Sequence, residues 1–158
     1  MRYSFLIDEN ILYHAVRGVD KHDKPDETAA EFVRSIARIC HTLTIHRVLL
    51  DKYWRIIQKL KLERSSAAEA LAFISMFLNN LSKRILEFSD LPELPAGVVV
   101  PTEDAEIVRA ALITRPIIVT ADEDLRASIM AHRSLGLRAL GPKEALDLAR
   151  QNLPDESH

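Results

Sequence analysis

The stretch YSFLIDENIL, residues 3–12, contains the pattern that decides the fold. Its first five residues form a short apolar run typical of a buried strand, and Asp8 ends that run. Residues 9–17 then predict a helix whose inner face carries Ile11, Leu12 and Ala15. A strand followed at once by a helix is the repeating unit of α/β proteins.

The same unit recurs along the chain. Apolar runs predict further strands at residues 42–45, 98–100, 117–120 and 135–140. Helices are expected at residues 26–40, 48–61, 66–88 and 102–112, then from the capping pattern of Thr120 and Glu123 to residue 132, and at 143–151. The long helix 66–88 is expected to begin at a capping box made by Ser66 and Glu69 and to turn Leu81 inward. The alternation predicts a parallel α/β sheet with helices on both faces.

The bulk composition fits one ordinary globular domain. The chain has 158 residues and a net charge of −2, so no overall basic field attracts nucleic acid. Cys40 is the only cysteine, which excludes an intrachain disulfide or a CxxC metal site and suits a reducing cytoplasm. No apolar run approaches the ~20 residues of a membrane span. We expect a single domain over residues 1–151 and a flexible tail over 152–158.

Four acidic residues stand at the predicted ends of strands: Asp8, Asp51, Asp104 and Asp122. The carboxyl ends of parallel strands line one crevice, where ligands of α/β proteins bind. Carboxylates that converge there repel one another unless cations lie between them, and hard divalent metals prefer such oxygen ligands. The pattern therefore predicts a divalent-metal site. The alternative for Asp104 and Asp122 is that each only offsets the dipole of its helix.

Other polar residues accompany these acids. Asp124 lies two residues beyond Asp122, Asn10 lies two residues after Asp8, and Thr120 lies two residues before Asp122. We expect Asp124 to approach the site, Asn10 to support it and Thr120 to cap its helix. No zinc spacing of histidines and no glycine-rich phosphate loop is present in the sequence.

A basic stripe is expected on the helix 48–61. Lys52, Arg55 and Lys59 recur at three- and four-residue spacing and so share a face that suits an RNA backbone. The alternative is an ordinary solvated face.

These segments resemble the PIN-domain family of metal-dependent ribonucleases. The resemblance rests on FLIDENIL (5–12), VVVPTEDAEIVRAAL (98–112), IIVTADEDLRASI (117–129) and LGLRALGPKEALDLA (135–149), which follow the family's order over nearly the whole chain. It implies a three-layer α/β/α sandwich with a central, mainly parallel sheet, and Mg²⁺- or Mn²⁺-dependent endonucleolytic cleavage of RNA. It also implies that Asp8, Asp104 and Asp122 are metal ligands and that Asp124 is an accessory acid.

One departure concerns the acid that the family places at the start of its next helix. Here that stretch reads VLLDKYWRII (48–57), so the usual Glu falls on Asp51 or on Lys52, with Glu31 as a third candidate. We prefer Asp51 as the fourth catalytic acid. Lys52 would instead bring a cation to the site and lower its metal affinity, which favours an alternative function as a catalytically silent scaffold that binds RNA or a protein.

The resemblance also suggests partners. Many small members of the family are toxins of toxin–antitoxin pairs, often dimeric, so we expect an RNA substrate, an antitoxin protein and a homodimer in the cytoplasm. The loop GVDKHDKP (18–25) is irregular for the family and is expected to carry substrate or partner contacts.

Overall fold

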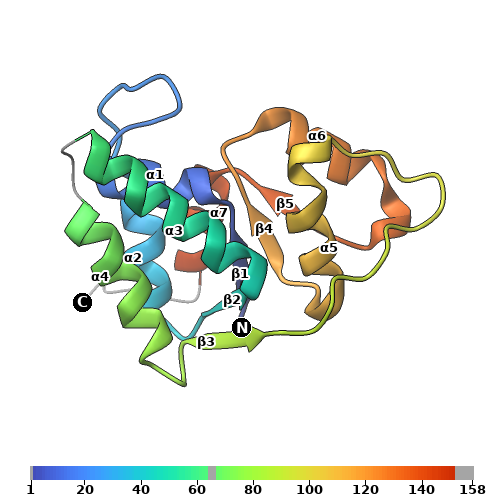
Figure 1. Cartoon of the computed structure of the whole chain (residues 1–158), viewed down its shortest axis with the longest axis horizontal. Helices are drawn as coiled ribbons and strands as arrows, with labels where there is room; N and C mark the ends of the chain where they lie inside the picture. Colours follow the sequence, from blue (N-terminus) through green and yellow to red (C-terminus); the bar gives the residue numbers. More distant parts are fainter. Residues whose placement is uncertain (1, 64–66, 152–158) are drawn as a thin grey trace.

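A computed structural model of the chain describes residues 2–63 and 67–151 (Figure 1). Within them, five strands form one sheet in the order β3-β2-β1-β4-β5, and each neighbouring pair is parallel. The strands are β1 (Ser4–Ile7), β2 (Thr42–His46), β3 (Arg84–Glu87), β4 (Ile117–Val119) and β5 (Ala139–Leu140). The predicted α/β class with a parallel sheet is confirmed.

Helices flank this sheet. Within the described residues they are α1 (Glu9–Arg17), α2 (Thr28–Arg38), α3 (Arg47–Leu62), α4 (Ala67–Leu78), α5 (Ala105–Thr114), α6 (Glu123–Ala131) and α7 (Pro142–Arg150). In Figure 1, α1 to α4 lie together on the left, α5 and α6 lie on the right, and the strands run between them. This arrangement is the three-layer sandwich that the resemblance implies. None of the helices in the described ranges is long and apolar enough to cross a membrane.

The core explains why the opening stretch is so apolar. β1 is the central strand, and Phe5, Leu6 and Ile7 are all buried because helices cover both faces of the sheet. The ring of Phe5 meets that of Phe32 in α2 edge to face at 5.1 Å. A strand that is buried on both faces has an apolar side chain at every position. A polar side chain such as that of Asp8 therefore comes only where the strand ends.

The predicted long helix 66–88 is wrong in its second half. α4 ends at Leu78, and the side chain of Asn80 accepts hydrogen bonds from the backbone and hydroxyl of Ser82, which turns the chain. Residues 84–87 then form β3, paired with β2, while Leu81 is 79% exposed rather than buried. The expected capping residue Ser66 lies outside the described residues.

The predicted strand at residues 98–100 is also wrong. Val99 is 76% exposed, and this part of the chain is irregular between Pro92, Pro95 and Pro101, which supply no backbone N–H. The place beside β2 is taken by β3 instead. The last strand is shorter than predicted because residues 133–135 form a 3-10 turn, η2 (Arg133–Leu135). The expected tail 152–158 lies outside the described residues.

Candidate functional site

The order of the strands brings two of the predicted acids together. The chain passes from β1 outward to β2 and β3, and then returns to β4 on the other side of β1. The carboxyl ends of β1 and β4 therefore flank the point where the winding reverses, which is where open α/β sheets bind ligands. Asp8 directly follows β1, and Asp122 begins the helix after β4.

Asp8 is held rigidly at this point. Its backbone N–H donates to the carbonyl of Val119 at 2.9 Å, and its side chain is buried. One carboxylate oxygen accepts from the N–H of Glu9 at 2.9 Å. The other accepts from the hydroxyl of Thr120 at 2.8 Å and from the amide of Asn10 at 3.2 Å. These donors supply hydrogen bonds to both oxygens of a buried carboxyl group.

Thr120 and Asn10 act as ties between the two strand ends. The Thr120 hydroxyl also accepts from the N–H of Asp122 at 3.1 Å, and the Asn10 side-chain oxygen accepts from the N–H of Ala121 at 3.3 Å. The cap of α6 is Asp122, whose Oδ1 accepts from the backbone N–H groups at 124 and 125. The hydroxyl of Thr120 therefore positions Asp8 rather than capping the helix.

Asp104 reaches the same edge from a different kind of element. It closes the 3-10 turn η1 (Thr102–Asp104) and precedes α5, rather than following a strand. Burial, then the charges of Asp122 and Asp8, raise the pKa of its carboxyl from 3.8 to about 6. Asp104 therefore lies near enough to Asp8 and Asp122 for their charges to disfavour its own.

Glu9 completes the cluster of acids, which we call the acidic edge: Asp8, Glu9, Asp104 and Asp122. Lys52 lies beside this cluster. Burial, and then the charge of Asp8, raise the pKa of Glu9. The Lys52 ammonium lies 3.8 Å from a Glu9 carboxylate oxygen, and only 12% of the Lys52 side chain is exposed. Lys52 also lowers the pKa of Glu9 and of Asp104, so it offsets part of the negative charge.

Sequence reasoning did not single out Glu9 or the role of Tyr53. A glutamate in a first helical turn looks like any dipole-compensating acid. Tyr53 is buried with Leu49, Ile57 and Leu60 on the apolar face of α3, yet its hydroxyl donates to the carbonyl of Ile7 at 2.6 Å and so fixes the end of β1 beside the site. Only its neighbourhood in space, which the sequence does not show, distinguishes it from a core residue.

The other predicted site residues have different surroundings. Asp51 is exposed, one residue before Lys52 on α3. Asp124 is exposed in the first turn of α6, where its backbone N–H donates to Asp122. Glu31 pairs with Arg150 at 3.1 Å. The predicted basic stripe is divided, because Lys52 faces Glu9, Arg55 is exposed and the Lys59 ammonium lies 4.4 Å from the centre of the Tyr13 ring.

The donor chemistry of the acidic edge fits a hard divalent cation, since its free ligands are carboxylate oxygens crowded enough to repel. The spacing is not that of a finished metal site. Among the residues that the structure describes, no three His, Cys, Asp or Glu side chains lie close enough together to hold a metal ion. A cation at this edge would therefore have to draw Asp104 and Asp122 closer to Asp8.

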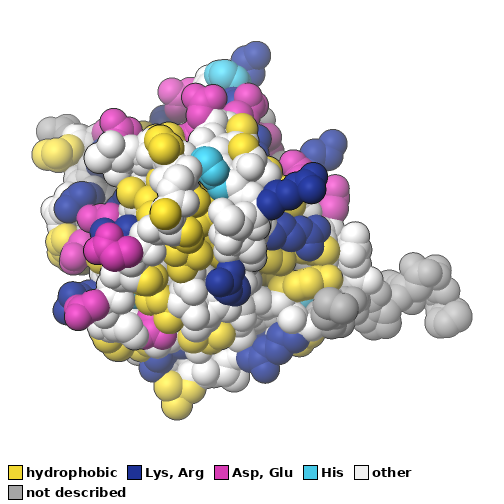
Figure 2. Space-filling view, turned by 90° about the vertical axis from the view of Figure 1, so that its right-hand side faces the viewer, with side chains coloured by type: hydrophobic (Ala, Val, Ile, Leu, Met, Phe, Trp, Pro, Cys, Tyr) yellow, Lys and Arg dark blue, Asp and Glu magenta, His cyan; other side chains and the backbone are white. Residues whose placement is uncertain are grey.

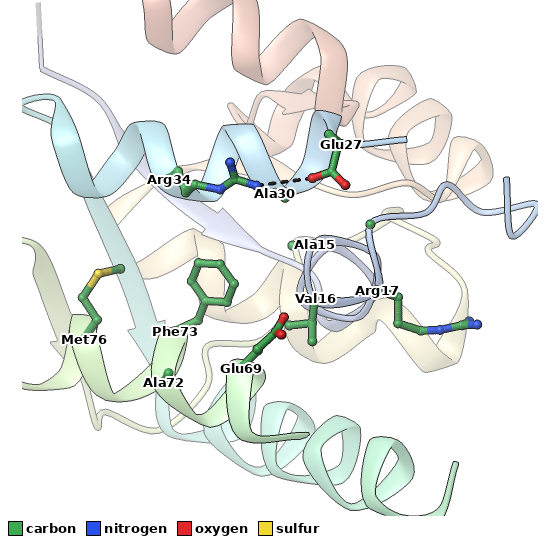
Figure 3. Close-up of a pocket in the computed structure, with 11 residues that line it drawn as sticks. Ala15, Val16, Arg17, Glu27, Ala30, Arg34, Glu69, Ala72, Phe73 and Met76 are labelled. Atoms are coloured by element: carbon green, nitrogen blue, oxygen red, sulfur yellow. Dashed lines mark hydrogen bonds and ion pairs between the residues drawn. The ribbon is translucent and has the colours of Figure 1, made fainter. Parts of the chain in front are cut away.

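The surface around α5 and α6 is seen in Figure 2. Acidic side chains gather near the top of this face, and Lys and Arg side chains lie near its centre and on both of its sides. A cavity of about 500 Å³ lies elsewhere, between α1, α2 and α4 (Figure 3). Phe73 and Met76 of α4 face α2 there, beside the ion pair of Glu27 with Arg34. None of the site residues predicted from the sequence lines this cavity.

Comparisons with known proteins add a likeness of overall structure. No family model matches the chain, and no curated protein matches it. The chain is similar in structure to a PilT N-terminus (PIN) domain protein from the hyperthermophilic archaeon Sulfolobus solfataricus P2. The alignment covers 98% of this chain and 99% of that one, with 14% identity and a TM-score of 0.48.

Proposed function

We propose that this protein is a divalent-metal-dependent endoribonuclease whose reaction centre is the acidic edge. The proposal is supported by the position of Asp8 and Asp122 at the reversal point of the sheet, with Asp104 near enough for their charges to raise its pKa. Such a point is where α/β folds place their ligands, and crowded carboxylates there suit metal-assisted cleavage of a phosphodiester.

The chain's own residues have distinct tasks in this proposal. Asp8, fixed by Thr120 and Asn10, would be the rigid ligand of Mg²⁺ or Mn²⁺, and Asp104 and Asp122 would complete its binding from the other side. The bound metal would supply Lewis acidity to the scissile phosphate and lower the pKa of an attacking water. Tyr53 and Asn10 keep the strand ends in place while the carboxylates adjust.

Cleavage of a quenched fluorescent single-stranded RNA tests the proposal. The full chain should cleave it with Mn²⁺ or Mg²⁺ and not with EDTA. Asp8→Asn and Asp122→Asn should each lower the rate roughly a hundredfold or more, because each removes a charge from the metal ligands. Asp147→Asn on the exposed side of α7 is the matched control and should cleave normally. Full metal-dependent activity in Asp8→Asn would remove the proposal.

The position of Lys52 favours a second candidate, a catalytically silent scaffold. An ammonium beside Glu9 already does part of what a metal would do, which is to offset crowded negative charge. A silent protein would bind RNA equally well with Mn²⁺ and with EDTA, and Mn²⁺ would not raise its unfolding temperature. A nuclease, in contrast, would unfold at a higher temperature in Mn²⁺.

The partners remain part of the proposal. An RNA substrate, an antitoxin protein that blocks the acidic edge, and a homodimer in the cytoplasm are supported by the size of the chain and by its resemblance to PIN-domain toxins. Sedimentation of the purified chain tests the homodimer directly.

A further inference from the structure

A second cavity of about 380 Å³ lies beside the acidic edge. Ala121 and Glu123, the two neighbours of Asp122, form part of its wall, so the cavity and the acidic edge adjoin along the chain. We call this cavity the loop pocket, because the loop after α1 forms much of it. Its wall includes the side chains of His14, Lys21, His22, Glu123, Arg126 and Lys143. Its volume lies in the range of pockets that hold a small ligand, roughly 300–1,000 Å³.

Two contacts hold the loop that forms the pocket. Val19 and Pro25 form an isolated antiparallel bridge that closes the loop, and the Lys21 ammonium lies 2.7 Å from a carboxylate oxygen of Glu123 on α6. The loop is therefore fastened to the helix that Asp122 begins. A ligand in the pocket meets a wall that is already formed, which lowers the entropic cost of binding.

The acids in the wall of the pocket are already paired. Asp20 accepts from the N–H groups of His22 and Lys24 at 2.8 and 3.0 Å, and Asp26 accepts from the N–H of Thr28 at 2.9 Å. Glu123 is paired with Lys21. Their negative charge is thus offset within the loop, and they leave no carboxylate that needs a metal.

The donors of the wall are not paired in the same way. Among the described residues, the rings of His14 and His22 and the ammonium of Lys143 make no hydrogen bond or ion pair with another residue. Burial lowers the pKa of His14, so near pH 7 its ring offers one donor and one acceptor. Arg126 uses one guanidinium N–H on the carbonyl of Thr120 at 2.7 Å and keeps others for a ligand.

We propose that the loop pocket is a subsite for one nucleotide of a single-stranded RNA whose backbone continues onto the acidic edge. Lys143 and Arg126 contact the phosphate, and His14 hydrogen-bonds the base. The strand must be single, because a base enters a pocket only when it is unstacked and unpaired. The inference rests on the proposed nuclease function and adds a substrate class to it.

The first test is binding in EDTA, where no cleavage occurs. Uridine 5′-monophosphate and adenosine 5′-monophosphate are titrated, each by itself, into the full ¹⁵N-labelled chain. The backbone amide NMR signals of His14, Thr28 and Lys143 should shift together. A fluorescein-labelled single-stranded RNA octamer should bind Lys143→Gln and His14→Gln about tenfold more weakly than wild type, which is about 1.4 kcal/mol. Lys24→Gln, in the same loop but outside the pocket, is the control and should bind normally.

The outcomes separate this inference from the nuclease proposal. Binding at the pocket without any RNA cleavage in Mn²⁺ supports the subsite and overturns the nuclease. Cleavage in Mn²⁺ with an unchanged KM in both Lys143→Gln and His14→Gln overturns the subsite and leaves the nuclease standing. The subsite is also overturned if the nucleotides shift NMR signals only in other parts of the chain. It is overturned as well if the loop pocket binds a protein and no nucleotide.

Discussion

The acidic edge and the loop pocket are neighbours, and their carboxylates have different surroundings. At the acidic edge, burial and the charges of Asp122 and Asp8 raise the pKa of Asp104, and Lys52 offsets part of this effect. In the loop pocket, Asp20 accepts from N–H groups of its own loop, and Asp26 accepts from the N–H of Thr28 at the start of α2. A carboxylate that lies beside other acids favours a cation, whereas one surrounded by N–H donors shapes its loop.

The largest expected effect comes from loosening the acidic edge. Thr120→Val removes the hydroxyl that donates to Asp8 at 2.8 Å, and a buried carboxylate oxygen then loses its best donor. We expect the free energy of unfolding to fall by about 1–3 kcal/mol. Thr120→Ser keeps the hydroxyl and should retain most of the stability. Urea denaturation measures the change as a shift of midpoint at constant slope.

Thr44 is the matched control for that experiment. It is equally buried, on β2, but among the described residues its hydroxyl has no hydrogen-bond partner. Thr44→Val should therefore be neutral or stabilising. Equal losses in Thr44→Val and Thr120→Val would show that the hydroxyl does not hold Asp8, and the contrast between the two regions would lose its structural basis.

The sequence predicts the parts of this site that are local. Residues 3–12 and 117–129 each place an apolar strand, an acid and a helix in immediate succession, so Asp8 and Asp122 follow from pattern alone. β3 does not, because RILE at 84–87 continues the helical spacing of α4, and it becomes a strand only by pairing with β2. Strand pairing between distant segments depends on contacts that no local pattern contains.

The choice between Asp51 and Lys52 is a second limit. Adjacent residues on a helix point about 100° apart, so a small rotation of α3 decides which one meets Glu9. That rotation is set by the burial of Leu49, Tyr53 and Ile57 along one face of α3. The sequence shows the helical periodicity of α3. It does not show which side of the helix is turned toward the acidic edge.

A moderate effect is expected from pH, with opposite signs in the two regions. Asp104 has a pKa of about 6 in the folded chain and 3.8 ordinarily, so between these pH values the folded state binds more protons than the unfolded one. Stability is then highest below about pH 4 and falls as pH rises through 6, by about 1 kcal/mol after allowing for the partial exposure of Asp104. In EDTA, Asp104→Asn should reduce this slope and leave only the smaller contribution of Glu9, whose pKa is also raised.

Asp20 should show the reverse slope. Hydrogen bonds from Lys24 and His22 hold its pKa below 3.8, so its contribution is present above that pH and is lost as pH falls further. Asp20→Asn should flatten the dependence of stability on pH only at the acidic end, below 3.8.

The Asp104 prediction has its own contrary outcome. Parallel curves of stability against pH for wild type and Asp104→Asn from pH 4 to 7 would mean that the carboxylates of the acidic edge do not repel.

The smallest effect on stability, and the sharpest on function, is expected from Lys52→Met. Removing the ammonium leaves Glu9 and Asp104 without their cation, so the metal-free chain should lose about 0.5–1 kcal/mol. Mn²⁺ should then stabilise the variant more than wild type, with an affinity roughly three- to tenfold higher, because the cation that competed for the same charge is gone. Thermal unfolding with and without Mn²⁺ measures both.

Lys59→Met is the control, since Lys59 lies on the same helix but against Tyr13. It should not change the response to Mn²⁺. If Lys52→Met gains Mn²⁺ binding and RNA cleavage together, Lys52 restrains a working centre. If it gains Mn²⁺ binding without cleavage, the acidic edge is a metal site in a scaffold. If Mn²⁺ has no effect on either protein, the carboxylates meet for a structural reason, and the loop pocket would be the feature that remains to explain RNA binding.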